Sequence, residues 1–415
     1  MFRCRKRAVR RDAGAKRLRL LAEFLRAKSV RREANGQEET SSQDSEIQVQ
    51  NHQLIMKLPH DLLFKILILL PAESLFMLQF VCKKWFNLIN SSVFIRHHSR
   101  QSETVLICQK MTSTAPENNL KSYFHFLDLD HGNHHSFVES IVVNLADVIT
   151  SYDGLVLATV KNQSSLMLMN PLTRKYTSLP LGTLTDFCFE SYGIAFCNDS
   201  SLYKVVHLCC EKEGDSSCEI LSICASTRKW TRIEGPSSEL LRNVRQTNPV
   251  SIGGSLYWMS GKHESDYFII SINVENEKFI TKKLPISSRK HSRIMEIGGS
   301  LGFVGYGEDH YLMQGWILMK DGKELEENWV NSFNINLDNV SVVAICSSRN
   351  GEKMVFESPR DCLYVYDFDN DEMKEVHSGD YIDPWFERIE KLYIPHRNTL
   401  VSWEDHYQVT FPCSS

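Results

Sequence analysis

The sequence lacks the patterns that mark several common enzyme classes. It contains no His-Glu-x-x-His zinc motif, and we predict no nucleophile elbow of an α/β-hydrolase. Its 12 cysteines include no Cys-x-x-Cys pair, and no apolar leader with a cleavage site is visible at the start. We therefore expect reduced thiols and a location in the nucleus and/or the cytoplasm.

Long apolar runs are missing too. The most apolar stretch extends from Leu62 to Val81, but Lys65, Pro71 and Glu73 interrupt it. The resulting pieces of roughly ten residues are shorter than the ~20 that a helix needs to cross a bilayer. We expect no membrane partner.

Candidates for a metal or phosphate site are few. The histidines at 97–98 and 131–136 lie in polar turns without a set of cysteine or acidic partners. The glycine-rich residues 298–309 lack the lysine and the helix that hold a phosphate, so we interpret them as β-turns. We predict no catalytic residue, no cofactor and no metal.

Charge is distributed unevenly. Residues 1–32 carry 13 Lys and Arg against Asp12 and Glu23, a local net charge of +11 that leaves −15 for the rest of a chain whose total is −4. We predict a basic, partly helical extension at 1–34 and a polar linker at 35–53. Three interpretations of the extension stay open: a nuclear-import signal, an organelle transit peptide and an inert solvated segment. Nucleic acid is not expected as a partner.

Residues 54–98 are predicted to form a module of three short helices. Leu58-Pro59 opens the first helix, Asp61 suits its positive end, and apolar residues then recur at spacings of three and four until Pro71 stops it. A module of this size buries little surface internally, so its many apolar side chains indicate a partner. Docking on the chain's own next domain is the alternative.

In this order and spacing the module resembles an F-box. The resemblance rests on Leu58-Pro59, Asp61-Leu62-Leu63, Ile66-Leu67, Leu70-Pro71, Ser74-Leu75, Val81-Cys82-Lys83, Trp85, Leu88-Ile89 and Phe94. It implies docking on the Skp-type adaptor of a cullin-RING ubiquitin ligase. The residues it assigns to the adaptor contact are Leu58, Pro59, Leu62, Ile66, Leu67, Leu70, Pro71 and Leu75, while Val81, Cys82 and Trp85 would hold the helices together. Three positions depart from the family pattern: Lys65 replaces the usual Glu, and Leu69 and Met77 replace frequent Arg residues.

Residues 99–411 are predicted to be all-β. Short runs rich in Val, Ile, Tyr and Phe alternate with Gly, Asn, Asp and Ser. Thirteen candidate strands exceed the number in a seven-strand sandwich; they are 104–109, 123–130, 154–160, 165–170, 203–210, 219–226, 255–260, 268–274, 301–306, 313–319, 342–348, 353–358 and 362–369.

Two degenerate repeats run through this region. Glycine precedes an apolar strand at Gly154, Gly254 and Gly299, and a strand, polar turn and second strand recur four times. The second repeat predicts outer hairpins with Tyr176, Trp230, Phe279 and Met373 packed between neighbouring sheets. About six four-stranded units with a period of roughly 45 residues indicate a β-propeller. Its closing sheet is expected to combine 104–130 with 391–403.

The phrases "SYDGLVLATV", "MNPLTRKY", "YKVV", "IGGSLYW" and "VVAICSSRNGEKMVFE" resemble the F-box-associated domain of plant F-box proteins, relatives of kelch-type receptors. The resemblance implies a non-catalytic substrate-recognition subunit of an SCF-type E3 ubiquitin ligase, which joins an adaptor, and through it a cullin, to an unidentified substrate protein. The alternative is a nuclear scaffold that binds a partner without causing its degradation. A propeller enzyme would require converging carboxylates or a metal set at the central mouth, and the sequence indicates neither.

Overall fold

The computed structural model describes two compact units that divide between Gln101 and Ser102, and each is considered by itself. The residues described are 58–404 except 115–118, 129–142, 145, 161–164, 185–186, 212–215, 225–227, 238–239, 242–247, 264–265, 288–290, 308–310, 321–326, 338–340, 360–361 and 378–390. The predictions for the basic extension, the linker and the histidines at 131–136 lie outside these residues. No helix within the described ranges is long and apolar enough to span a bilayer.

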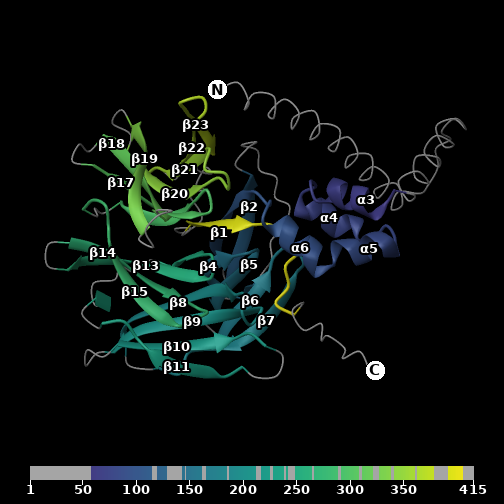
Figure 1. The fold of residues 1–415 in the computed structure, drawn as a ribbon, viewed down its shortest axis with the longest axis horizontal. Helices are drawn as coiled ribbons and strands as arrows, with labels where there is room; N and C mark the ends of the chain where they lie inside the picture. The colour runs from purple at the N-terminus through teal and green to yellow at the C-terminus, as the bar shows by residue number, and fades with distance from the viewer. Residues whose placement is uncertain are drawn as a thin grey trace, which may run out of the picture. The chain divides into compact units, whose positions relative to one another are not determined.

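The helical unit contains four short helices among its described residues (Figure 1), one more than predicted. They are α3 (His60–Leu67), α4 (Ala72–Leu78), α5 (Lys83–Ile89) and α6 (Ser92–Ser99). Pro59 and Pro71 cap the starts of α3 and α4, as the sequence predicted for a helix opening and a helix stop. The fourth helix begins at a polar cap, because the Ser91 hydroxyl accepts a hydrogen bond from the Phe94 amide at 3.3 Å.

The core of the helical unit is apolar and small. Its buried side chains are Leu63, Leu67, Ile68, Leu70, Ala72, Leu75, Leu78, Trp85, Leu88, Ile89, Phe94 and Ile95. Two polar contacts join its ends. His98 of α6 contacts the Leu70 carbonyl oxygen through Nε2 at 2.8 Å, and the Asn90 side-chain amide donates to Gln79 Oε1 at 3.2 Å.

The β unit consists, in its described residues, of six four-stranded antiparallel sheets (Figure 1). The first sheet contains β1 (Thr104–Thr114), β2 (Asn119–Asp128) and β3 (Val143–Asn144). The second sheet contains β4 (Ala146–Tyr152), β5 (Leu155–Val160), β6 (Ser165–Asn170) and β7 (Lys175–Pro180). The third sheet contains β8 (Phe187–Cys197), β9 (Leu202–Glu211), β10 (Ser216–Ser222) and β11 (Trp230–Glu234). The fourth sheet contains β12 (Val250–Ile252), β13 (Ser255–His263), β14 (Asp266–Asn273) and β15 (Lys278–Lys283). The fifth sheet contains β16 (Arg293–Ile297), β17 (Ser300–Tyr306), β18 (Leu312–Lys320) and β19 (Glu327–Asn336). The sixth sheet contains β20 (Val343–Ser347), β21 (Lys353–Glu357), β22 (Leu363–Asp367) and β23 (Glu372–His377).

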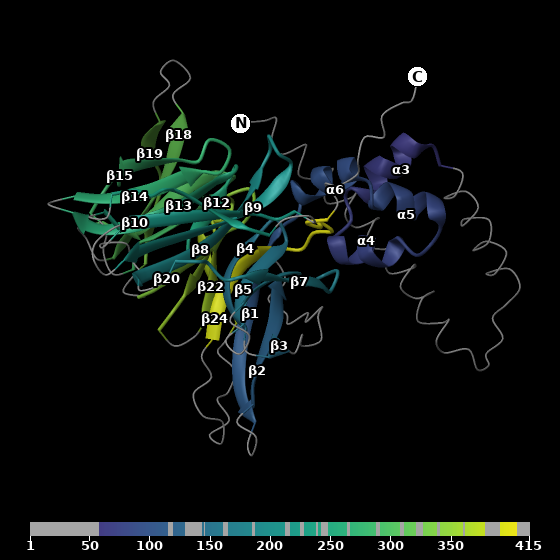
Figure 2. The same ribbon diagram turned by 90° about the horizontal axis from the view of Figure 1, so that it is seen from below.

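The last strand, β24 (Lys391–Arg397), closes the ring. It pairs with β1 in antiparallel register, with Ile107 opposite Ile394, and so completes the sheet that begins the β unit. Figure 2 shows the yellow β24 beside the blue β1. The edge strands β24, β4, β8, β12, β16 and β20 contact one another in sequence around a closed circle. This architecture confirms the predicted β-propeller and its predicted closing sheet.

The repeated glycines form tight turns between the first and second strands of a sheet. Both central residues of these two-residue hairpins have positive φ, which glycine adopts without steric cost and which suits the twist of paired strands. The φ pairs are 55° and 85° for Asp153-Gly154, 55° and 78° for Gly253-Gly254, and 58° and 85° for Gly298-Gly299. The glycine-rich residues at 298–299 are therefore a β-turn, as predicted.

The outer hairpins share a second turn. A side-chain oxygen at the end of the third strand accepts hydrogen bonds from two backbone amides of the turn, at Asn170, Asn273 and Asp367. The prediction that Tyr176 packs between sheets is wrong, since its side chain is 74% exposed on the outer strand β7. Trp230 is buried, while Phe279 and Met373 pack against the clusters between sheets.

The core of the β unit is distributed between neighbouring sheets. One cluster joins Val206 and Leu208 of β9 to Leu256 and Trp258 of β13. Comparable clusters join the β12 sheet to the β16 sheet, the β16 sheet to the β20 sheet, the β20 sheet to the closing sheet, and the closing sheet to the β4 sheet. Each sheet therefore buries its faces against its neighbours, as a propeller requires.

Candidate functional site

Exposed apolar side chains concentrate on the helical unit. Seven of the large apolar residues that are exposed in the described part of the chain lie within residues 58–100, and the much longer β unit holds the other six. Small soluble domains seldom expose so much apolar area without a partner. We call this set the helical apolar surface; its members are Leu62, Leu69, Met77, Phe80, Val81, Phe86 and Val93.

Two stripes on helix α3 separate core from surface. Leu63 and Leu67 point into the core, with Leu70 buried one turn later. Leu62 is 49% exposed, and Leu69, just beyond the helix, is 62% exposed. The two stripes are offset by one position because residues four apart share one face of a helix.

The predicted adaptor residues divide accordingly. Leu62, Pro59 and Pro71 are exposed, and Leu58 and Ile66 are half-buried. The outward orientation predicted for Leu67, Leu70 and Leu75 is wrong in this structure, because all three are buried and Leu75 is fully so. Whether any of the eight contacts an adaptor stays a prediction.

The residues predicted to hold the helices together also differ among themselves. Trp85 is 2% exposed and lies in the core, and Cys82 is half-buried at the start of α5. Val81 is 38% exposed, so it lies on the helical apolar surface instead. The three departures from the family pattern, Lys65, Leu69 and Met77, are exposed.

A cavity of about 380 Å³ lies at the centre of the β unit. The circle of edge strands lines it, with residues from β4, β12, β16, β20 and β24. Aliphatic side chains, including Ile149, Val250, Ile294 and Ile345, form much of its wall. Its size is at the lower end of the range for ligand pockets, which suits a short segment or small group rather than a folded domain.

Charged residues gather where four of these strands end. Asp153 follows β4, Glu296 lies near the end of β16, Arg349 follows β20, and Arg397 ends β24. The Arg397 guanidinium donates from Nη2 to Glu296 Oε1 at 2.6 Å. The same four residues influence one another electrostatically, which places them in one cluster, the exit cluster.

Burial governs the ionisation of the exit cluster. It raises the pKa of Asp153, against the opposing effect of a hydrogen bond that the Tyr203 hydroxyl donates to Asp153 Oδ2 at 3.1 Å. Burial also lowers the pKa of Arg349, and the nearby positive charge of Arg397 lowers it further. Burial therefore disfavours the charged forms of both Asp153 and Arg349.

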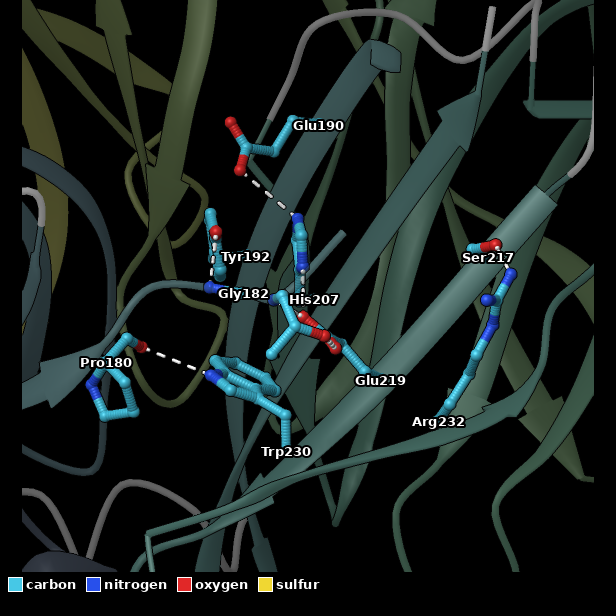
Figure 3. Close-up of polar contacts among 10 residues, drawn as sticks. Pro180, Gly182, Glu190, Tyr192, His207, Ser217, Glu219, Trp230 and Arg232 are labelled. Atoms are coloured by element: carbon cyan, nitrogen blue, oxygen red, sulfur yellow. Dashed lines mark hydrogen bonds and ion pairs between the residues drawn. The ribbon is translucent and has the colours of Figure 1, made fainter. Parts of the chain in front are cut away.

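A second polar cluster surrounds His207 of β9 (Figure 3). His207 is fully buried; its Nδ1 lies 2.9 Å from Glu219 Oε1, and its Nε2 lies 3.2 Å from Glu190 Oε1. The ring stacks on Tyr192, with centroids 4.3 Å apart. Burial alone would raise the pKa of Glu190, but hydrogen bonds with His207 and Tyr192 hold it below its ordinary value. Both imidazole nitrogens therefore lie within 3.2 Å of a carboxylate oxygen.

Hydrogen bonds from this cluster reach the neighbouring sheet. The backbone amide and hydroxyl of Thr183, in the connection from β7 to β8, donate to Glu219 at 2.5 and 2.6 Å. The Trp230 indole donates from Nε1 to the Pro180 carbonyl oxygen of β7 at 3.3 Å (Figure 3). We interpret the cluster as a structural clamp between the β4 and β8 sheets.

One sequence pattern was overlooked. Gly298 to Gly302 have the Gly-x-Ser-x-Gly spacing of a nucleophile elbow. In the structure Ser300 begins strand β17 directly after a hairpin turn, whereas a nucleophile elbow joins a strand to a helix. Across the described ranges, no group of three or more His, Cys, Asp or Glu side chains is arranged to hold a metal ion.

Comparison with known proteins gives two family matches. Residues 91–406 match the F-box associated beta propeller domain, and residues 55–97 match the F-box domain. Two F-box/kelch-repeat proteins of Arabidopsis thaliana are 25% identical over 295 residues (67% of this chain, 72% of that protein) and 26% identical over 271 residues (60% and 72%). Among solved structures, an oligogalacturonate lyase in complex with manganese aligns with a TM-score of 0.40 at 14% identity, covering 68% of this chain and 81% of that one, a likeness too distant to support an argument.

Proposed function

The chain belongs to the F-box-associated β-propeller family and carries an F-box domain, and from this premise we propose that it is the substrate-recognition subunit of an SCF-type cullin-RING ubiquitin ligase. An F-box implies binding to a Skp-type adaptor, and members of the F-box family are typically non-catalytic subunits. In the proposed complex the helical unit docks on the adaptor, the adaptor joins the cullin, and the β unit holds the substrate protein.

The observation that carries the proposal is the helical apolar surface. Its exposed side chains, Phe80 at 70% and Leu69 at 62% among them, lie on a unit too small to cover them with its own core. Complete burial of such a side chain by a partner is worth about 1.5–3 kcal/mol. Several together supply enough free energy for a stable docking contact.

The role of such a receptor is proximity. A substrate held near the charged conjugating enzyme presents its lysines at a high effective concentration, so the receptor needs no acid, base or nucleophile. The cavity and its exit cluster are compatible with this role, because they supply a binding surface at the centre of the propeller.

A pull-down of the full chain with purified Skp-type adaptor tests the docking step. We expect Leu62→Asp and Leu69→Asp to abolish recovery, because each places a charge in an apolar contact, and Asn87→Asp, a change of the same charge at an exposed polar position of α5, to retain it. Equal recovery of all variants contradicts the proposal.

Degradation is tested separately through the half-life of a captured partner. If the chain is a ligase receptor, proteasome inhibition and Leu62→Asp should each lengthen the half-life of the partner. A partner whose half-life changes in neither case indicates the alternative function, a scaffold that binds without degradation. The predicted nuclear or cytoplasmic location stays a prediction.

A further inference from the structure

The outer edges of the six sheets differ in how they are protected. Backbone groups on the free side of an edge strand can pair with a foreign strand, and proteins usually prevent this with short strands, charged side chains or proline. In the described β unit, five of the six outermost strands carry such a feature along their length. They are β3 with two residues, β7 with Lys175 and Pro180, β11 with Arg232 and Glu234, β15 with Lys278, Lys282 and Lys283, and β23 with Glu372, Lys374 and Glu375.

Strand β19 is the exception. It is ten residues long, and Glu327 at its first position is its one charged residue. Lys282 of β15 donates a hydrogen bond to the Glu327 carbonyl oxygen. A bulge at Ser332, where the register with β18 shifts by one residue, divides the strand, but residues 327–331 stay regularly paired. No charged side chain and no proline therefore protects the edge over residues 328–336.

Side chains cover the free sides of other outer strands. On β7 the Arg228 guanidinium donates from Nη1 to the Ser178 carbonyl oxygen at 2.6 Å, and on β15 the Trp329 indole donates from Nε1 to the Lys283 carbonyl oxygen at 2.8 Å. Across the part of the chain that the structure describes, no side chain bonds to the backbone of residues 328–335. In an antiparallel sheet every second residue of an edge strand points both its N–H and its C=O outward, so β19 presents unpaired donors and acceptors.

One face of the β18–β19 hairpin is also uncovered. Trp329 packs against the cluster between the fourth and fifth sheets, on the opposite face. Ile317 lies opposite Val330 in register and packs against the cluster between the fifth and sixth sheets. Val330 is 45% exposed, and Met319, two residues beyond Ile317 on the same face, is 49% exposed. β18 and β19 have nine and ten residues, whereas β22 and β23 of the sixth sheet have five and six. The longer hairpin thus keeps apolar side chains beside its free edge.

These features define the chemistry of an occupant. Unpaired backbone groups call for an extended segment that adds as a further strand. The edge carries no cation that would attract an acidic segment, and a charged side chain laid against Val330 and Met319 would lose its hydration without gaining a partner. Side chains of a strand alternate between its two faces, so an uncharged segment with apolar residues at alternate positions fits both the edge and the open face.

We infer that strand β19 captures an extended, uncharged segment of the substrate protein as a fifth strand of its sheet, with Val330 and Met319 in contact with apolar side chains of that segment. This inference rests on the proposed function, since it assigns the place and the chemistry of substrate capture. A second copy of the chain is the competing occupant, and the experiments below separate the two.

The probe is a synthetic library of random decapeptides with acetylated and amidated ends, selected on the full chain bound to its adaptor. We expect recovered peptides to be low in charge and to alternate apolar with polar residues. On binding such a peptide, hydrogen exchange should slow over residues 327–336 and stay unchanged over the charged edge 372–377. Recovery of charged peptides, of peptides without alternation or of no peptide overturns the inference, as does unchanged exchange over 327–336.

Backbone pairing has a signature of its own. N-methylation of a recovered peptide, one residue at a time, should weaken binding about ten-fold or more at every second residue, because each of these amides donates to β19. Methylation of the residues between them should change binding by less than about two-fold. Equal effects at all positions, or an effect at none, would show that side chains alone hold the peptide and would overturn the inference.

Charged variants test the edge itself by fluorescence polarisation with a labelled recovered peptide. Val330→Lys should weaken binding about ten-fold or more, because it protects the edge as lysines protect β15. Asn328→Lys adds the same charge at an exposed polar position of β19 and should weaken binding as well. The matched control is Ile280→Lys, which replaces a 64% exposed apolar side chain on β15 and should leave binding within about two-fold. Undiminished binding by Val330→Lys and Asn328→Lys, or an equal loss in Ile280→Lys, contradicts the assignment.

Sedimentation of the adaptor-bound chain identifies the occupant. We expect a single copy of the chain in each complex, and a dimer that Val330→Lys dissociates would make a second copy the occupant and overturn the inference. The proposed function fails differently, because it predicts adaptor recovery that Leu62→Asp removes and Val330→Lys leaves intact.

Discussion

Replacement of Asn170 by Asp should open the seam at which the propeller closes. The Asn170 side chain is 1% exposed and forms hydrogen bonds with two different segments of the chain. Its Oδ1 accepts hydrogen bonds from the amides of Leu172 and Thr173 in the outer turn. Its Nδ2 donates to the carbonyl oxygens of Thr399 and Val401, at 3.0 and 2.8 Å, in the segment that follows β24.

The substitution isolates the second role. Asp367 shows that a carboxylate forms the same turn, since its Oδ1 accepts from the amides of Asp369 and Asn370. Asn170→Asp should therefore retain the turn, but it removes both donors and turns a carboxylate oxygen toward two carbonyls. A buried acceptor left without its donor costs about 1–3 kcal/mol, so the loss of both donors predicts a decrease of about 2–6 kcal/mol in the free energy of unfolding of the β unit.

The assay is urea unfolding of the full chain followed by hydrogen exchange of peptides that cover 391–404. The urea midpoint should fall, and exchange should rise first in those peptides. Asp367→Asn, the reverse change at an exposed turn, should cost less than about 1 kcal/mol because Asn accepts the same amide bonds. Equal losses of stability in the two variants would contradict the conclusion that the Asn170 donors stabilise the closing segment.

Three further predictions concern other parts of the chain. Leu75→Ala should destabilise the helical unit by about 2–5 kcal/mol, whereas Leu69→Ala should change stability by less than about 0.5 kcal/mol and weaken adaptor binding; thermal melts and adaptor titrations check this, and a destabilised Leu69→Ala would contradict it. Gly154 and Gly299 share a φ of 85°, but a Cβ added at Gly154 would clash with Thr399 Oγ1, whereas one added at Gly299 would meet open space. Gly154→Ala should therefore lower the free energy of unfolding by about 1–3 kcal/mol more than Gly299→Ala, as measured by chemical unfolding; equal losses would count against the contact. Burial lowers the pKa of His98 below 6.5, so the folded state disfavours its protonation and the helical unit should lose up to about 1.4 kcal/mol per pH unit as the pH falls below about 6.5; in melts from pH 7.5 to 5, His98→Gln should flatten this dependence, and an unchanged slope would exclude His98 as its source.

Much of the fold was accessible from the sequence because its repeats have local physical causes. The paired glycines predict hairpins through their positive φ, and Asn170 and Asn273 mark the outer turns through their side-chain oxygens. The closing sheet was also predicted correctly, with β24 beside β1.

The candidate site was harder to predict than the fold, because the strands that line the cavity have weak sequence patterns. Three of them, β4, β12 and β16, were absent from the predicted strands. The β12 strand has three half-buried residues, and the buried positions of β16 alternate imperfectly, since a strand beside a cavity is neither a core strand nor a surface strand. The exit cluster draws on residues from 153 to 397, and no local pattern links them.

The helical unit illustrates a second limit. Spacings of three and four identify an apolar helix but leave the direction of each face open when apolar residues occupy both, as Leu62, Leu63, Ile66 and Leu67 do. The one-position error at Leu67 and Leu70 follows from that ambiguity, and the fourth helix was missed because α6 is short and ends in polar residues.

The position of β24 links the synthesis of the chain to the completion of its central cavity. During translation the ribosome synthesises β1 almost three hundred residues before its partner β24. The sheet that closes the propeller therefore stays incomplete until the end of synthesis. Arg397 arrives with that final strand. A polypeptide that ends before β24 would lack both the strand that pairs with β1 and the Arg397 side chain of the exit cluster. Closure of the ring and completion of the cavity wall therefore depend on the same strand.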